Sequence, residues 1–145
     1  MGSDAFSALY RDQVLAHGRQ PRHAGRLEGR AHRASANNAL CGDRVAVSLR
    51  LRGDGAIAEL RHDSEGCLLC LASASLMAGR VPGLAPDEVA PLANTLRDAL
   101  ARGDEAGLGD LAALIGAAPY PSRHRCALLP WDALLAALDA PETEA

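Results

Sequence analysis

One stretch constrains the fold of this chain more than any other, because apolar and polar residues alternate along it. The apolar positions of residues 44–52 are Val45, Val47, Leu49 and Leu51. A period of two residues predicts a β-strand with one buried face and one face in solvent. The Gly-Asp-Gly sequence at residues 53–55 offers positive-φ positions for a tight turn, so a second strand is predicted over residues 56–63. The two strands form an antiparallel hairpin.

Two cysteines flank this hairpin, Cys41 before its first strand and Cys67 after its second. Because antiparallel pairing brings the outer ends of a hairpin together, we expect these two thiols to be neighbours. Asp43 follows Cys41 closely, and Gly42 permits a turn that aims both side chains at one centre. With Cys126 as a third thiol, this set is sufficient to fill a tetrahedral metal shell. We take that convergence as the hypothesis to test.

The length of the chain makes a disulfide framework unnecessary. A chain of 145 residues can bury a core of its own, so we expect one domain over residues 1–145. Its ordered core is expected over about residues 4–139, with a flexible tail over residues 140–145. The sequence shows no signal peptide and no apolar run near the 18 or so residues of a membrane span. We therefore expect a cytoplasmic protein with reduced thiols and no membrane contact.

Composition excludes several functional classes. The net charge is −3 and only four residues are aromatic, so the chain lacks the positive field and the stacking platforms of a nucleic-acid binder. All fifteen basic residues are arginine. Without lysine the chain can form neither a pyridoxal Schiff base nor a lysine-containing phosphate loop.

Helices are predicted on both sides of the hairpin. Apolar spacing and end signals predict an amphipathic first helix ending at Gly18, a buried helix over residues 67–78, a helix ending at Gly103, a short helix over residues 110–115 and a terminal helix starting at Pro130. Residues 103–109 are predicted to form a loop. The Pro-Tyr-Pro sequence at residues 119–121 predicts an extended approach to the last cysteine. Residues 30–36 have weak strand propensity and stay unassigned on that ground.

Several motifs carry a resemblance to a known family. They include Asn-Asn-Ala-Leu-Cys-Gly-Asp-Arg at residues 37–44, Glu-Gly-Cys at residues 65–67 and Arg-His-Arg-Cys-Ala-Leu-Leu-Pro-Trp at residues 123–131. In order and spacing the chain resembles the U-type iron-sulfur cluster assembly proteins, the IscU/NifU-like family, from Leu9 to about Leu138. The resemblance implies a single compact α+β domain of the SufE/IscU-like type. It also implies a small three-stranded antiparallel sheet packed against helices, with its first strand at residues 30–36.

The same resemblance implies a function for the clustered residues. In that family the residues matching Cys41, Asp43, Cys67 and Cys126 surround zinc or a nascent iron-sulfur cluster. The implied partner is a pyridoxal-dependent cysteine desulfurase of the SufS type, and the recipients are downstream cluster-assembly or apo iron-sulfur proteins. The chain would then be a sulfurtransferase-like acceptor rather than a stand-alone enzyme. Its lack of lysine fits, because the cofactor chemistry belongs to the partner.

The residues around the third cysteine distinguish the branches of the family. IscU-type scaffolds have a histidine ligand directly before this cysteine, whereas Arg125 precedes Cys126 here. His124 is two residues away, and on a helix such a pair faces different directions. The SufU-like branch has a longer segment between the second and third cysteines and an arginine three residues before the third. Residues 79–110 and Arg123 match both features, so we favour the SufU branch and zinc as the cofactor.

Cys41 is our candidate for the residue that accepts the persulfide sulfur, because it lies on a loop. Cys126 is the rival candidate. Asp43 would be the exchangeable ligand, an oxygen among soft sulfur donors. Without the family context, each residue has a simpler interpretation. Asp43 would be an ordinary turn residue, and Cys126 would be a small buried apolar residue.

Two nearby side chains have open roles. Arg123 can pair with Asp43 when metal is absent, screen the persulfide, or be a plain surface residue. Cys70 lies one helical turn after Cys67, so it can compete for metal, form a labile pair with Cys67, or pack in the core.

Two alternatives to sulfur transfer also remain. The first is a scaffold on which a [2Fe-2S] or [4Fe-4S] cluster is built and transferred. The second is a purely structural zinc domain, although such sites are usually closed by cysteine and histidine alone.

Overall fold

The structure is a computed structural model that describes residues 3–104 and 107–144. Its elements are α1 (Ser3–Arg19), β1 (Ala31–Asn38), β2 (Asp43–Leu51), β3 (Ile57–Glu65), α2 (Leu68–Arg80), α3 (Pro86–Arg102), the 3-10 helix η1 (Gly109–Ala117), α4 (Pro121–Asp139) and β4 (Glu142–Thr143). Two residues of the loop predicted over 103–109, and the last residue of the predicted tail, lie outside the described residues.

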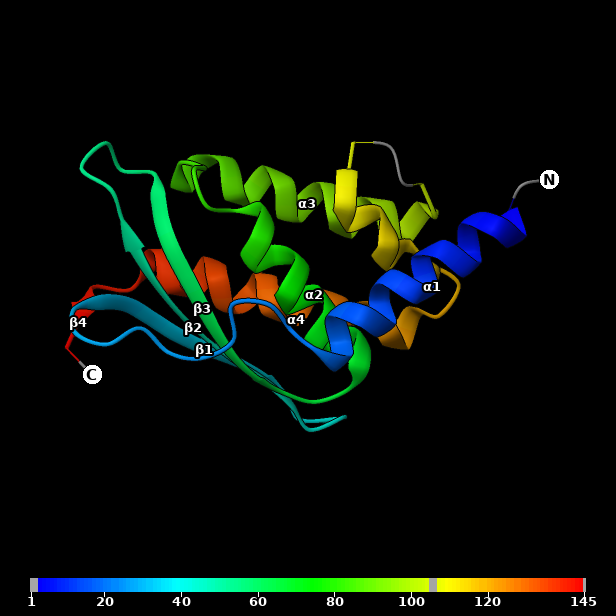
Figure 1. The fold of residues 1–145 in the computed structure, drawn as a ribbon, viewed down its shortest axis with the longest axis horizontal. Helices are drawn as coiled ribbons and strands as arrows, with labels where there is room; N and C mark the ends of the chain where they lie inside the picture. Colours follow the sequence, from blue (N-terminus) through cyan, green and yellow to red (C-terminus); the bar gives the residue numbers. More distant parts are fainter. Residues whose placement is uncertain (1–2, 105–106, 145) are drawn as a thin grey trace.

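The fold consists of an antiparallel sheet with helices packed on it (Figure 1). The strand order is β3-β2-β1-β4. Helices α2 and α4 pack on the sheet, α1 packs on α2, and α3 packs on α4. The α+β class and the packing of an antiparallel sheet on helices are confirmed, but the expectation of three strands is wrong because β4 adds a fourth. None of the described helices is long and apolar enough to cross a membrane.

The predicted hairpin is formed by β2 and β3. Val45, Val47 and Leu49 are buried on the core face of β2, as their alternation predicts. The strand register pairs Arg44 with Glu65, the residues at the open end of the hairpin. The residues just before β2 and just after β3 therefore meet at one end of the sheet.

Strand β1 forms despite weak propensity, because it pairs with β2 along most of its length, from His32 opposite Leu49 to Asn38 opposite Asp43. The first strand implied by the family resemblance is thereby confirmed. The turn from β1 to β2 contains Cys41 and is closed by a hydrogen bond from the Gly42 N–H to the Asn38 carbonyl, at 2.8 Å.

Strand β4 lies in the segment that was expected to be a flexible tail. Glu142 and Thr143 pair with His32 and Ala31. An ion pair of 3.1 Å from Arg30 to Glu142 stabilises this pairing. The pairing extends the sheet at one end of β1 only.

Helix α4 begins nine residues earlier than predicted, and this changes the setting of Cys126. Pro121, rather than Pro130, occupies the first turn, where a missing N–H costs nothing. The predicted extended approach to Cys126 is therefore wrong, because the helix that contains Cys126 already starts at Pro121. Pro130 lies inside the helix next to the fully buried Trp131. Cys126 is consequently on a helix, which packs against β1 and β2.

The predicted end of the first helix at Gly18 is wrong, because Gly18 has a packing role inside the helix. Helix α1 continues to Arg19, and Gly18 is buried where α1 crosses α2. A Cβ atom at Gly18 would lie 2.4 Å from Leu68 Cδ1 and 2.9 Å from the Leu68 backbone oxygen. The glycine is needed for close helix packing.

Gly18→Ala is therefore expected to lower the free energy of unfolding by about 1–3 kcal/mol, because the backbone of α2 must move away. Gly79→Ala in α2 is the matched control. A Cβ atom there has nothing within 4 Å, so this change is expected to stabilise by about 0.5–1 kcal/mol. Urea denaturation followed by circular dichroism measures both changes. Equal effects of the two substitutions would contradict the packing argument.

His62 is a buried titratable residue beneath residues 21–30. Its Nε2 donates to the Arg22 carbonyl at 2.9 Å, and its Nδ1 lies 2.8 Å from Ser64 Oγ. Burial holds the pKa of His62 below its usual value, with a smaller contribution from His23 in the same direction, against a hydrogen bond to Arg22 that raises it. Burial also lowers the pKa of His17. The unfolded chain therefore binds more protons at these two residues than the folded one.

We expect the free energy of unfolding to fall as the pH drops from about 7.5 to about 5.5, through the ordinary histidine pKa. In His62→Gln, whose amide cannot titrate, the dependence on pH should be weaker. Urea titrations at several pH values measure the slope. An unchanged slope in the variant would show that His62 does not carry the effect.

Candidate metal centre

Asp43 lies at the open end of the β2–β3 hairpin, with its side chain buried. The Cys67 N–H donates a hydrogen bond of 2.9 Å to Asp43 Oδ1. The Cys41 thiol donates to Asp43 Oδ2 at 3.1 Å, and Cys67 Sγ lies 3.6 Å from the same oxygen. The two cysteines that flank the hairpin thus meet at one carboxylate, as the antiparallel pairing led us to expect.

Cys126 brings the third thiol to this carboxylate from α4. The ligand atoms of Cys41, Asp43 and Cys126 all lie within 4.8 Å of one another. Cys67 is not part of this group of three, and its sulfur accepts the Cys70 N–H at 3.4 Å as the N-cap of α2. Cys41 is exposed, whereas Cys126 is buried.

The geometry fits a small tetrahedral ion. Metal–ligand bonds of about 2.0–2.3 Å place neighbouring ligand atoms about 3.5–3.8 Å apart. The 3.1 Å and 3.6 Å contacts to Asp43 Oδ2 are already near this range. Three sulfur atoms and one carboxylate oxygen are a donor set that suits tetrahedral zinc, and Cys67 is the member that would have to move toward the other three.

Electrostatics at the site also favour a bound cation. Burial raises the pKa of the Cys126 thiol, and hydrogen bonds to Asp43 and Cys67 raise it further. Burial also acts to raise the pKa of Asp43, but hydrogen bonds from the Cys67 N–H and from the Cys41, Cys126 and Cys67 thiols outweigh it and hold that pKa below its usual value. The carboxylate is thus ionised while the buried thiol keeps its proton. An ionised Cys126 requires a positive charge beside it.

Gly66 is a site residue that sequence reasoning did not single out. A Cβ atom at Gly66 would lie 2.2 Å from Asp43 Oδ1, so only glycine leaves room for the carboxylate. The Glu-Gly-Cys motif was the only available signal. Gly42, in contrast, has a φ of +73° and no atom within 4 Å of the point where a Cβ atom would lie, so its glycine is required by the turn and not by a close contact.

Three candidates from the sequence lie outside the cluster. Cys70 is fully buried in the core, and burial raises its pKa to about 12. His124 Nε2 bonds to the Ala118 carbonyl at 2.9 Å. The Arg123 guanidinium lies over the Tyr120 ring, 4.9 Å from its centroid. The hydrogen-bond partners of Asp43 are backbone and thiol groups, so the hypothesis of an Arg123–Asp43 pair gains no support.

Comparison with known proteins gives a consistent picture. The family "NifU-like N terminal domain" matches residues 9–139. The zinc-dependent sulfurtransferase SufU of Bacillus subtilis is 33% identical over 89% of this chain and 88% of that protein. The iron-sulfur cluster assembly scaffold protein IscU of Streptococcus pyogenes is 30% identical over 95% of this chain and 87% of that protein.

Among solved structures, the N-terminal NifU-like protein of Brucella abortus superposes with a TM-score of 0.75 at 28% identity, covering 90% of this chain and 92% of that one. The sequence and the fold thus lead to the same group of proteins. The chain belongs to the NifU-like N-terminal domain family, together with its SufU and IscU relatives.

Proposed function

We propose that this protein is an iron-sulfur cluster assembly component that accepts sulfur from a cysteine desulfurase in a zinc-dependent manner. The observation that carries the proposal is the exposed Cys41 thiol beside a buried carboxylate and a buried thiol, Asp43 and Cys126. A sulfur acceptor must be reachable by a donor protein, and its neighbours must stay fixed. The sulfur then passes to downstream assembly or apo iron-sulfur proteins.

Cys41, Asp43, Cys67 and Cys126 are the proposed zinc ligands. Zinc, when bound, keeps the thiols ionised near neutral pH without redox chemistry of its own. The buried Asp43 and Cys126 hold the centre in place from β2 and α4. Asp43 also anchors the start of α2, because it accepts the N–H of Cys67. The likeness to a sulfurtransferase described as zinc-dependent supports this choice of metal.

The transfer step is a thiol exchange in which Cys41 is the nucleophile. Its thiolate attacks the outer sulfur of the donor's cysteine persulfide, and a new S–S bond forms at Cys41. The S–S bond of the donor breaks, and its electron pair leaves on the donor's cysteine as a thiolate. The transferred sulfur keeps its proton and its oxidation level, so no external oxidant or reductant is needed. The exposure of Cys41 favours it over the buried Cys126 as acceptor.

The two alternatives have different signatures. A cluster scaffold would yield a stable, coloured cluster on Cys41, Cys67 and Cys126 after anaerobic reconstitution with iron and sulfide. A purely structural zinc site would unfold on metal removal and would leave desulfurase rates unaffected. The exposure of Cys41 argues against a closed structural site.

Metal analysis and a desulfurase assay test the proposal. We expect one zinc per chain and a several-fold rise in sulfide or alanine production when the wild-type protein is added to the desulfurase. Cys41→Ala should remove this stimulation, whereas Cys70→Ala, in the core, should retain it. Stimulation that is unchanged in Cys41→Ala would exclude Cys41 as acceptor and favour Cys126.

A further inference from the structure

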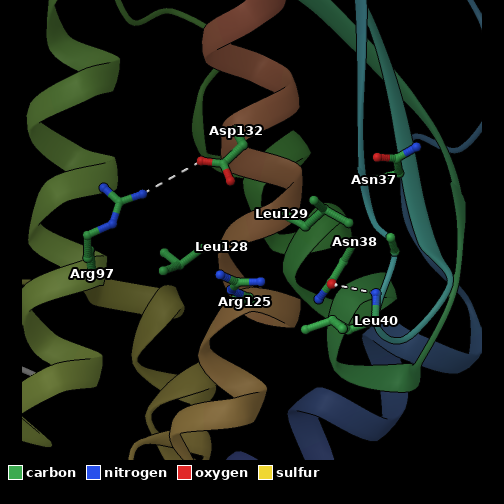
Figure 2. A pocket seen from close by; sticks show the side chains of 9 residues that line it. Asn37, Asn38, Leu40, Arg97, Arg125, Leu128, Leu129 and Asp132 are labelled. Carbon is green, nitrogen blue, oxygen red and sulfur yellow. Dashed lines mark hydrogen bonds and ion pairs between the residues drawn. The ribbon is translucent and has the colours of Figure 1, made fainter.

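A groove runs along the outer face of α4 beside the candidate metal centre (Figure 2). Its floor is formed by residues one helical turn apart on α4, namely Arg125, Leu128, Leu129 and Asp132. Arg97 of α3 lies on one side, and residues 37–40 at the end of β1 lie on the other. The volume of about 450 Å³ is in the range of clefts that take up a ligand-sized group.

The groove opens at the end of a strand edge that is only partly covered. On the side of β1 away from β2, β4 pairs with Ala31 and His32. In residues 3–104 and 107–144 no strand pairs with residues 33–38 on that side. Figure 1 shows β4 at one end of β1 and the turn from β1 to β2 at the other. Ser35 and Asn37 are exposed along this edge. An uncovered edge of this kind is a template for an added strand.

Charge and apolar exposure indicate what the added strand must carry. Arg97 is paired with Asp132 at 3.6 Å, but Arg125 has no hydrogen-bond or ion-pair partner among the described residues. Leu40, at the rim, is 86% exposed, and Leu128 and Leu129 lie across from it. The groove therefore suits an extended peptide with one acidic side chain for Arg125 and one apolar side chain beside Leu40.

We propose that an extended segment of the sulfur-donor protein adds to the free edge of β1 at residues 33–38 and fills this groove. The inference rests on the proposed function, because a donor must approach Cys41. Leu40 directly precedes the exposed Cys41 on the turn between β1 and β2, so a segment held in the groove lies close to this turn. Backbone pairing with β1 supplies the register, and the acidic residue at Arg125 supplies the specificity.

The chain's own C-terminal strand does not fill the groove. Glu142 lies opposite His32 and Thr143 opposite Ala31, so β4 runs toward residue 30 and away from residues 33–38. A second copy of the chain would have to pair β1 with β1, and each copy would bring an unpaired Arg125 without an acidic partner for it. The free cation thus favours an acidic donor segment over self-association.

The test uses the full-length protein loaded with zinc and the cysteine desulfurase of the same organism. Amide hydrogen exchange is measured with and without the desulfurase, and binding is measured by calorimetry. We expect added protection at residues 33–38 in the complex. Arg125→Glu and Leu40→Asp should each weaken binding at least about tenfold, because each places a negative charge where the donor segment is expected to bring an acidic or an apolar side chain. Arg61→Glu is the matched control, because Arg61 is exposed on β3 at the opposite edge of the sheet.

Two readouts separate failure of this inference from failure of the proposed function. Sulfur transfer from glutathione persulfide needs Cys41 but no docked protein, so Arg125→Glu should match the wild type in this reaction and in zinc content. Two results would overturn the docking site but leave the proposed function intact, provided that the wild type still stimulates the desulfurase. One is no added protection of the amides of residues 33–38 in the complex. The other is equal affinity of Arg125→Glu and Arg61→Glu for the desulfurase. If the amides of β1 become protected from exchange as the protein concentration rises, in the absence of the desulfurase, two copies pair through β1. That result would also overturn the docking site.

Discussion

Cys126→Ser is expected to leave the protein nearly free of zinc after purification. The substitution nearly keeps the size of the side chain but replaces the proposed thiolate ligand with a neutral hydroxyl group. Loss of groups that merely support a ligand already weakens metal binding about 10–100-fold, so loss of a ligand should cost more than about 100-fold in affinity. Zinc content is measured by atomic emission, and affinity by competition with a chromophoric chelator.

Cys70→Ala is the control for this prediction, because Cys70 is a thiol close to the centre but packed in the core. It should retain one zinc per chain with only a modest loss of stability. Full zinc occupancy in Cys126→Ser would show that Cys126 is not a ligand, and equal zinc loss in both variants would contradict the assignment of Cys70 to the core alone. The comparison also tests the competing hypothesis that Cys70 takes part in metal binding.

Gly66→Ala is expected to damage both the stability of the fold and the metal centre. The added Cβ atom would lie 2.2 Å from Asp43 Oδ1, so the carboxylate must move and its bond from the Cys67 N–H is lost. Backbone strain at a φ of +152° adds to this cost. Together they should lower the free energy of unfolding by about 3 kcal/mol or more and weaken zinc binding at least about tenfold.

Gly55→Ala separates backbone strain from the collision. Gly55 also has a positive φ, of +91°, but its surroundings are open and it lies in the turn of the hairpin, at the end opposite Asp43. This variant should lose about 1–2 kcal/mol of stability and keep its zinc. Denaturant titration and zinc analysis of both variants check the pair. Normal zinc binding by Gly66→Ala would mean that zinc binding does not require the Asp43 carboxylate in its present position.

The local sequence pattern is sufficient to predict the hairpin, and with it that Cys41 and Cys67 lie close together. Strand alternation over β2 and the Gly-Asp-Gly turn are short-range signals, and antiparallel geometry brings the flanking residues together. Strand β1 was different, because its sequence has little propensity and it forms only by pairing with β2. Only the family motifs indicated it.

The predictions that were wrong or missing also depend on tertiary packing, which local sequence does not contain. Pro130 is a helix-breaking residue in isolation, but packing of the buried Trp131 and Leu134 carries α4 through it. Gly18 looks like a helix terminus, yet it is required by the nearby Leu68. The position of Cys126 beside Asp43 depends on how α4 packs on the sheet, which no local pattern contains. The role of Gly66 is likewise visible only once Asp43 is placed.

The central claim is that Cys41, Asp43, Cys67 and Cys126 bind one ion together, and X-ray absorption at the zinc edge tests it most directly. For the purified wild-type protein we predict a shell of three sulfur atoms at about 2.3 Å and one oxygen at about 2.0 Å. In Asp43→Ala the three sulfur atoms should remain, and a water oxygen should take the place of the carboxylate oxygen. A wild-type shell of nitrogen and oxygen atoms alone, or one with a single sulfur, would contradict the claim.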